Sequence, residues 1–353
     1  MCVVDFLDLF RYSKEKMRNA KKQKKRWERI MMPNYDVIAL GELLIDFTEN
    51  GHSEQGNPIL EANPGGAPAN VLSMLCRMGK KTMFIGKVGK DSFGTQLEEA
   101  LLEVGIKTDG LVKTEDVHTT LAFVHTLPDG DREFAFYRNP GADMMLSSKD
   151  IVPDWFKNAK VFHFGSLSMT AEPCREATKY ALKLAKEAGL TITYDPNLRE
   201  SLWSDLEKAR EMIAYGMSMC DVMKISDNEV LWFTGKDNYD DAVAAIRSQY
   251  KNIKLLLLTL GKDGSRAYLG DTRVDVPGFV QQSTIETTGA GDTFCGMAIH
   301  YILEHGLILT GAQLKEMLTL ANAAASIITT RKGAIRVMPT IDEVMALLQG
   351  GQS

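Results

Sequence analysis

The chain has 353 residues, of which 44% are hydrophobic and 25% are charged, a composition typical of a globular protein with a sizeable core. Its five cysteines are scattered and match no metal-ligand spacing, which favours reduced thiols and a cytoplasmic location over a disulfide framework. Residues 1–34 hold ten Lys or Arg and four Asp or Glu, which gives this segment a net charge of +6. Because the whole chain has a net charge of −5, residues 35–353 carry a net charge of −11. This acidic body argues against nucleic acid as a partner, and no apolar run approaches the roughly 18 residues of a membrane span.

Residues 1–34 form a basic extension that differs in composition from everything after it. We expect it to be disordered or weakly helical and non-catalytic, with a membrane-touching or targeting helix as the alternative. A secretory signal has its basic residues first, whereas here an apolar stretch at 3–10 comes before them. We expect the folded domain to cover 35–345 and a short tail to cover 346–353.

From Tyr35 onward, short apolar runs alternate with segments of helical periodicity. The predicted strands cover 36–40, 81–88, 160–164, 190–195, 221–226 and 254–260. The predicted helices cover 67–78, 94–104, 174–188, 206–217, 240–250, 292–305 and 311–330. Strands that alternate with helices indicate an α/β fold with a mostly parallel central sheet flanked by helices.

Two segments do not fit this alternation, at about 45–62 and 115–140. The second contains strand-like runs at 119–126 and 133–137, and the turn Pro128-Asp129-Gly130 between them indicates a hairpin. We therefore expect these segments to form a small β-sheet that covers the active site as a lid.

The most informative motif is Thr287-Thr288-Gly289-Ala290-Gly291-Asp292-Thr293-Phe294. Small residues allow the backbone to approach a ligand, and the helix that follows presents unpaired N–H groups and a partial positive charge. Such a turn binds phosphate, and Asp292 stands where a carboxylate can take a proton from a hydroxyl. It is not a Walker A loop, and an Asp that merely caps a helix is the structural alternative.

Two further segments place polar residues beside small-residue turns. In Asn63-Pro64-Gly65-Gly66-Ala67-Pro68-Ala69-Asn70, the amide of Asn70 projects from a first helical turn. In Gly41-Glu42-Leu43-Leu44-Ile45-Asp46, an acidic residue follows a buried strand. Carboxylates and amides that converge on one pocket suit polyols, because each hydroxyl can donate and accept. A plain helix start and a turn residue are the alternatives.

Weaker candidates lie at strand ends, where ligands bind in open parallel sheets. They are Asn197, Arg199, Thr259, Gly261 and Gly264, and to them we add Lys224 and, after the lid hairpin, Arg138. Taken alone, each of these residues fits a structural role better than a functional one. The six histidines show no HExxH motif or close pairing, so we assign none of them to metal binding or catalysis.

Taken together, the segments over about 35–345 resemble the ribokinase-like, or phosphofructokinase-B, carbohydrate kinase family. The matching signatures are GGAPAN at 65–70, KVGKDSFG at 87–94 and TTGAGDTF at 287–294. The stretches YDPNLR at 194–199 and REFAFYRNPGAD at 132–143 are most similar to those of its fructokinases.

The resemblance implies a role for each candidate residue. Asp292 would be the general base, and the anion hole would come from Gly289, Ala290 and Gly291. The sugar would be held by Asp46, Gly65, Gly66, Asn70 and Arg138. The ATP site would include Lys224, Ser226, Thr259, Gly261, Gly264, Asn322, Asn197 and Arg199. Glu229 would organise Mg²⁺ indirectly, although Ser226 replaces the Asn of the family's NxxE motif.

The same resemblance implies an ATP-dependent fructokinase that phosphorylates the 6-hydroxyl of D-fructose. A 2-keto-3-deoxygluconate kinase, another sugar kinase of the family, and a catalytically inactive sugar- or nucleotide-binding regulator are the alternatives. The family also implies K⁺ beside the anion hole, at a position where this chain has Glu286 in place of the usual Asp. Exposed edges of the lid predict a homodimer.

Overall fold

The computed structural model of the protein describes residues 35–126 and 132–350. The predicted basic extension and the turn Pro128-Asp129-Gly130 lie outside the described residues. Within the two described ranges, no helix has both the length and the apolar character needed to cross a bilayer.

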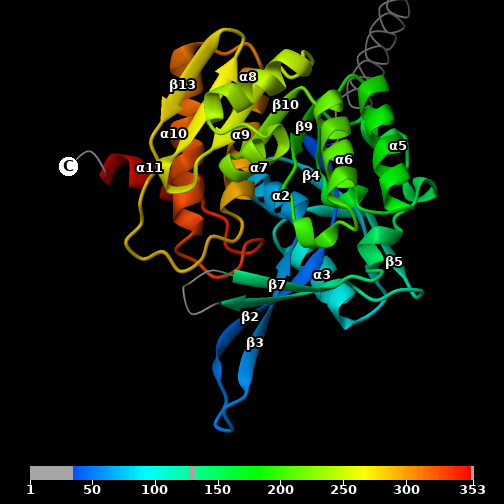
Figure 1. The fold of residues 1–353 in the computed structure, drawn as a ribbon. Coiled ribbons are helices and arrows are strands. Elements are labelled where there is room, and N and C mark those ends of the chain that lie inside the picture. The colour runs from blue at the N-terminus through cyan, green and yellow to red at the C-terminus, as the bar shows by residue number, and fades with distance from the viewer. Residues whose placement is uncertain (1–34, 127–131, 351–353) are drawn as a thin grey trace, which may run out of the picture. The chain divides into compact units, whose positions relative to one another are not determined.

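A nine-stranded sheet forms the centre of the folded part (Figure 1). Its order is β13-β12-β11-β10-β9-β8-β1-β4-β5, and all neighbours are parallel except in the β11-β12-β13 meander. The strands are β1 (Val37–Leu40), β4 (Thr82–Gly89), β5 (Lys107–Thr114), β8 (Val161–Gly165), β9 (Thr191–Asp195), β10 (Val222–Ser226), β11 (Leu255–Thr259), β12 (Ser265–Leu269) and β13 (Thr272–Val276). The predicted α/β class with a mostly parallel sheet is confirmed. The antiparallel meander and β5 were not predicted.

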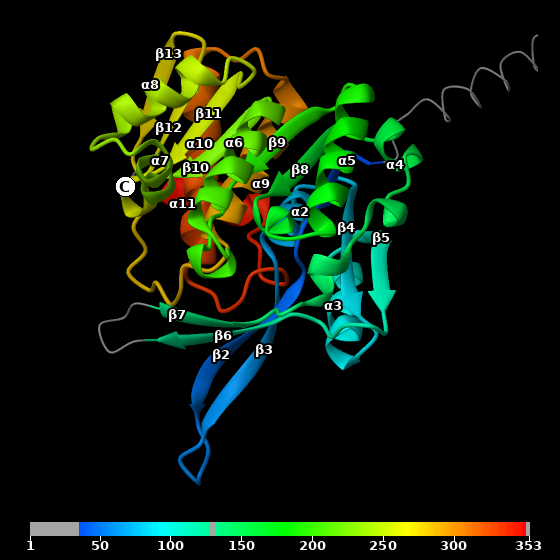
Figure 2. The same ribbon diagram turned by 45° about the vertical axis from the view of Figure 1, so that its right-hand side comes forward.

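Helices cover both faces of this sheet, because successive residues of each strand point to opposite sides. Ile38 and Leu40 of β1 pack in one apolar cluster, whereas Val37 and Ala39 pack in another. The first face is covered by α5 (Cys174–Glu187), α6 (Leu206–Met219) and α8 (Tyr239–Gln249). The second is covered by α2 (Ala67–Arg77), α3 (Ser92–Glu103), α9 (Ala290–His305) and α10 (Gly311–Ile328) (Figure 2).

A separate four-stranded sheet, the lid sheet, has the order β3-β2-β6-β7. Its strands are β2 (Leu44–His52), β3 (Pro58–Gly65), β6 (Leu121–Thr126) and β7 (Arg132–Tyr137). Phe47, Phe123 and Tyr137 form a chain of ring contacts on it, with centroids 4.9 and 5.1 Å apart. The predicted small sheet is therefore present, and it extends away from the central sheet (Figure 2).

Three more α-helices, of which α4 (Asp154–Lys157) is a single turn, complete those of the described part of the chain. Helix α7 (Asp227–Thr234) follows β10 and begins with a capping box between Ser226 and Glu229. Helix α11 (Ile341–Gly350) is the last element, so residues 346–350 of the predicted tail belong to a helix.

Candidate active site

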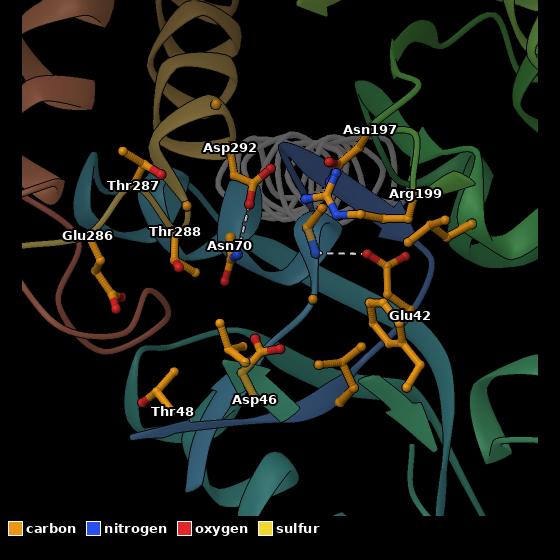
Figure 3. Close-up of a pocket in the computed structure, with 18 of the residues that line it drawn as sticks. Glu42, Asp46, Thr48, Asn70, Asn197, Arg199, Glu286, Thr287, Thr288 and Asp292 are labelled. Carbon is orange, nitrogen blue, oxygen red and sulfur yellow. Dashed lines mark hydrogen bonds between the residues drawn. The ribbon is translucent and has the colours of Figure 1, made fainter. Parts of the chain in front are cut away.

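One cavity, called the first cavity, has a volume of about 780 Å³ and lies where strands of the central sheet end beside the lid sheet (Figure 3). Its polar lining residues are Glu42, Asp46, Thr48, Asn70, Asn197, Arg199, Lys224, Asn228, Thr284, Glu286, Thr287, Thr288 and Asp292. Leu44, Val124, Phe136 and Leu167 add apolar surface. A concave site with several hydroxyl, amide and carboxylate groups suits a small polyol.

The first turn of α9 forms part of the wall of this cavity. Gly289 is its N-cap and has a φ of 75°, a conformation that glycine adopts at little cost. A Cβ at Gly289 would lie 2.9 Å from the Ala334 Cβ, so the site also lacks room for a side chain. The Ala290 N–H donates to the Thr287 carbonyl oxygen at 3.2 Å and closes the turn. The partial positive charge of the helix start therefore points toward the cavity, as an anion site requires.

Asp292 lies in this first turn, and its side chain is buried while still reaching the first cavity. Its Oδ2 accepts a hydrogen bond from Asn70 Nδ2 at 2.8 Å (Figure 3). Burial raises the pKa of Asp292, and the Asn70 hydrogen bond and the Lys224 charge oppose that rise. A raised pKa makes this carboxylate a better proton acceptor than an exposed Asp.

Lys224 lies in the middle of β10 (Val222–Ser226), and its ammonium lies beside the start of α9. Its Nζ donates to Asp195 Oδ2 at 2.9 Å, and both side chains are buried. A Cβ at Gly291 would lie 3.0 Å from the Lys224 Nζ, so this glycine lets the ammonium approach the helix start. The ammonium and the helix start together concentrate positive charge at one point.

The second cavity, of about 390 Å³, adjoins the first. It is lined by, among others, Ser226, Thr259, Gly261, Gly264, Phe279, Ala290 and Asn322. Asn322 is held in place because Ser265 Oγ donates to its Oδ1 at 2.9 Å and its Nδ2 donates to the Val276 carbonyl at 3.2 Å. Four residues line both cavities: Lys224, Thr284, Thr287 and Gly291. The two cavities therefore meet beside the start of α9.

Asp46 projects from β2 of the lid sheet into the first cavity (Figure 3). Gly65 is needed beside it, because a Cβ at Gly65 would lie 2.1 Å from Asp46 Oδ2. Gly66 has a φ of 130° and itself lines the cavity. Desolvation raises the pKa of Asp46, although its side chain is only partly buried. The structure thus brings the predicted sugar residues Asp46, Gly66 and Asn70 to one cavity.

Arg138 is not among the residues that line either cavity in the described part of the chain. Its guanidinium is buried and forms an ion pair with Asp143, in which Nε donates to Oδ2 at 2.8 Å. It also donates to Thr170 Oγ1 and to the Leu167 carbonyl, both at 3.0 Å. The predicted contact of Arg138 with a sugar stays a prediction, whereas its role in joining β7 to the body is observed.

Three residues predicted for ATP and Mg²⁺ follow strands β9 and β10 in the chain, and one of them, Glu229, lies in the first turn of α7. Asn197 and Arg199 line the first cavity and are not among the residues of the second. Glu229 lines neither, since Oε1 accepts from the Leu198 N–H at 2.7 Å and Oε2 accepts from the Ser226 N–H at 2.9 Å. Glu229 thus holds the Asn197 loop against α7, and an indirect link to a metal stays a prediction.

Glu42 and Asp195 were not predicted as site residues. Glu42 lines the first cavity, and burial raises its pKa to about 7. Asp195 is the partner of Lys224, and burial raises its pKa to about 7 as well. Both follow or end a buried strand, which is the signal that could have identified them from the sequence.

Comparisons with known proteins identify the family of the chain. Residues 34–341 match the model of the pfkB family carbohydrate kinases. The chain is 44% identical to a probable fructokinase-4 of Arabidopsis thaliana over 317 residues, which are 89% of this chain and 97% of that protein.

Two solved structures show the same fold. The fructokinase of Xylella fastidiosa with bound ATP is 31% identical, with a TM-score of 0.82 over 90% of this chain and 99% of that one. A double mutant of the Vibrio cholerae fructokinase, with bound fructose, ADP and potassium ion, is 26% identical, with a TM-score of 0.80 over the same shares.

Proposed function

Because the chain belongs to the pfkB family of carbohydrate kinases, we propose that it is an ATP-dependent fructokinase. It transfers the γ-phosphoryl group of ATP to the 6-hydroxyl of D-fructose and releases fructose 6-phosphate and ADP. One observation carries this proposal: the start of α9, with Asp292 in its first turn, lies where a polar cavity and a second cavity meet. Such an arrangement suits transfer between two bound substrates.

Fructose occupies the first cavity in this proposal. Asp46 on the lid sheet and Asn70 on α2 approach the sugar from two sides and fix its orientation through hydroxyl groups. The apolar residues Leu44, Val124 and Leu167 cover its carbon-bound faces. ATP occupies the second cavity, where Thr259, Gly261, Gly264 and Asn322 line the wall. Its terminal phosphate then reaches the start of α9.

Phosphoryl transfer needs positioning and charge stabilisation more than covalent catalysis. The backbone of Gly289, Ala290 and Gly291 and the Lys224 ammonium stabilise the charge on the moving phosphoryl group. Asp292 accepts the proton of the attacking hydroxyl, and Asn70 keeps its carboxylate oriented through the 2.8 Å hydrogen bond. Arg199, on the wall of the first cavity, meets the phosphoryl group from the sugar side.

Among the described residues no cluster of three or more His, Cys, Asp or Glu side chains could hold a metal ion by itself, so Mg²⁺ would be held through water and the ATP phosphates. Asp195 has a buried Oδ1 without a hydrogen-bond partner among the described residues, and it lies near Glu229 and Asp292. These carboxylates suit Mg²⁺ held through water. A bound Mg²⁺ neutralises the negative charge of the ATP phosphates. Glu286, whose Oε1 accepts from the Gly333 N–H at 2.8 Å, lines the first cavity beside the α9 turn and is proposed to support K⁺ binding.

The test is coupled ADP release with Mg²⁺-ATP and a panel of fructose, ribose, 2-keto-3-deoxygluconate, glucose and adenosine. Fructose is expected to give the highest kcat/KM by a wide margin. One observation favours the keto acid as second candidate, namely the cationic Arg199 on the wall of the first cavity. If the acid wins, the substrate assignment fails while the kinase chemistry stands. No ADP release with any of these sugars would favour a catalytically inactive regulator. A comparison of KCl with NaCl tests for K⁺.

We further propose that the protein acts in the cytoplasm as a homodimer joined through the lid sheet. The edge strands of that sheet are β3 and β7, and Ile59, Leu60 and Tyr137 are exposed on them. Exposed edges that carry apolar side chains favour pairing with a second sheet. Light scattering at micromolar concentration is expected to give the dimer mass, and a monomer mass would reject this assembly.

A further inference from the structure

Glu42 is a buried acid in the wall of the first cavity, and no role has so far been given to it. It lies in the short connection between β1 and β2, and 4% of its surface is exposed. Burying a carboxylate is costly unless donors surround it. Its Oε1 accepts a hydrogen bond from the Ala67 N–H at 2.9 Å (Figure 3). This bond links the connection to the start of α2.

Helix α2 cannot cap its own start. Its N-cap residue, Gly66, has no side chain to accept a hydrogen bond, and Pro68 in the first turn has no N–H. No larger residue fits at Gly66, because a Cβ there would lie 2.4 Å from the Glu42 carbonyl oxygen. Glu42 thus does from a distance what Ser or Asp does at many helix starts, because its Oε1 accepts a backbone N–H of the first turn.

The helix that Glu42 caps carries Asn70 one turn later. Asn70 donates to Asp292 Oδ2 at 2.8 Å, which joins α2 to α9 in the wall of the first cavity. At the other side of Glu42, β2 begins at Leu44 and leads to Asp46. The same side chain therefore stands between both elements that face the proposed sugar.

We propose that Glu42 is a positioning residue: by capping α2 it fixes Asn70, and Asn70 in turn holds the Asp292 carboxylate toward the acceptor hydroxyl. This inference rests on the proposed function, because it assigns Asp292 to proton transfer. Glu42 acts through the hydrogen-bond acceptor that it offers to Ala67, and not through its charge on the sugar.

The experiment is a double-mutant cycle with Glu42→Ala, Glu42→Gln and Asn70→Ala. Gln keeps an oxygen that can accept from the Ala67 N–H, so Glu42→Gln is the matched control. We expect Glu42→Gln to stay within about threefold of the parent kcat/KM for fructose. Glu42→Ala is expected to lower it about 10- to 100-fold, since small displacements of reacting groups have effects of that size. The KM for ATP should change less than about twofold in both variants.

In the Asn70→Ala background, Glu42→Ala should cost less than about threefold, because residues that act in series are not additive. Full additivity would show that Glu42 acts independently of Asn70 and would overturn the proposal. Equal losses in Gln and Ala would overturn it too, in favour of a charge effect. A Glu42→Ala protein that melts at lower temperature yet keeps its kcat/KM would reduce Glu42 to a structural cap.

The parent protein is assayed first with the whole sugar panel, so that the two proposals can fail separately. If another sugar is the substrate, the fructose assignment fails, and the cycle is run with that sugar. The positioning role is then judged by the same ratios.

Discussion

Replacing Asp292 by Asn is the sharpest test of the assigned proton acceptor. The two side chains have nearly the same size, and the Asn amide can still present an oxygen to Asn70 Nδ2, which preserves that hydrogen bond. The group that faces the cavity then becomes an NH₂ donor and can no longer take a proton. General-base catalysis contributes about 10²- to 10⁴-fold, so kcat should fall by that factor, equivalent to about 3–5 kcal/mol in the barrier.

Misfolding is not expected to confuse this result. Burial disfavours the ionised form of Asp292, so a neutral amide should leave the thermal stability unchanged or slightly higher. The assay is coupled ADP release at saturating Mg²⁺-ATP and fructose, with thermal unfolding and the KM for ATP as controls. If kcat for Asp292→Asn stays within about tenfold of the parent while both controls are normal, Asp292 is not the general base.

Three further predictions follow from buried charges and close contacts. Arg138→Met leaves Asp143 buried without its cationic partner and should lower the free energy of unfolding by about 3–5 kcal/mol in urea titrations. Arg273 forms an exposed ion pair with Asp275, so Arg273→Met is the control and should lower the free energy of unfolding by less than about 1 kcal/mol. Equal losses in the two variants would contradict the argument. The Glu42 carboxyl has its folded-state pKa raised from 4.5 to about 7, so its stabilising contribution is complete below pH 4.5 and is lost as pH rises toward 7. Between about pH 4 and about pH 8, the free energy of unfolding of the parent should therefore fall by about 3 kcal/mol more than that of Glu42→Gln. Identical pH profiles of unfolding free energy for the two proteins would refute the raised pKa of Glu42. Gly291→Ala places a methyl group 3.0 Å from the Lys224 Nζ. It should lower kcat about 10- to 100-fold in the ADP-release assay. An unchanged kcat would show that the Lys224 ammonium does not act in phosphoryl transfer.

Local patterns predicted the parallel part of the sheet except for its edge strand β5, whose residues are mostly polar and exposed or half-buried. Strands such as β11 are continuous apolar runs, because helices cover them on both faces, and such runs are easy to identify. The β12-β13 hairpin is different, since it carries Arg266, Arg273 and Asp275 in ion pairs at the sheet edge. Charged residues conceal the strand pattern there, and their pairing partners become visible only in three dimensions.

The candidate site shows a similar division. The turn before Asp292 and the glycines at 65 and 66 were identified because small residues next to a helix start have few other uses. The direction in which a long side chain points is not encoded locally. Arg138 could have faced the cavity, but Asp143 five residues later and the Leu167 carbonyl take its donors. Glu42 escaped notice because its role depends on a helix that starts 25 residues further along the chain.

The shared wall between the two cavities has a consequence for ligand design. Lys224, Thr287 and Gly291 belong to both cavities, so a ligand in one cavity lies next to a ligand in the other. A single molecule that joins a polyol to an adenine nucleotide through a short phosphate chain should therefore span both. Its second half binds at an effective concentration in the millimolar range set by the linker, so the affinity should exceed that of either half alone by about 10²- to 10⁴-fold.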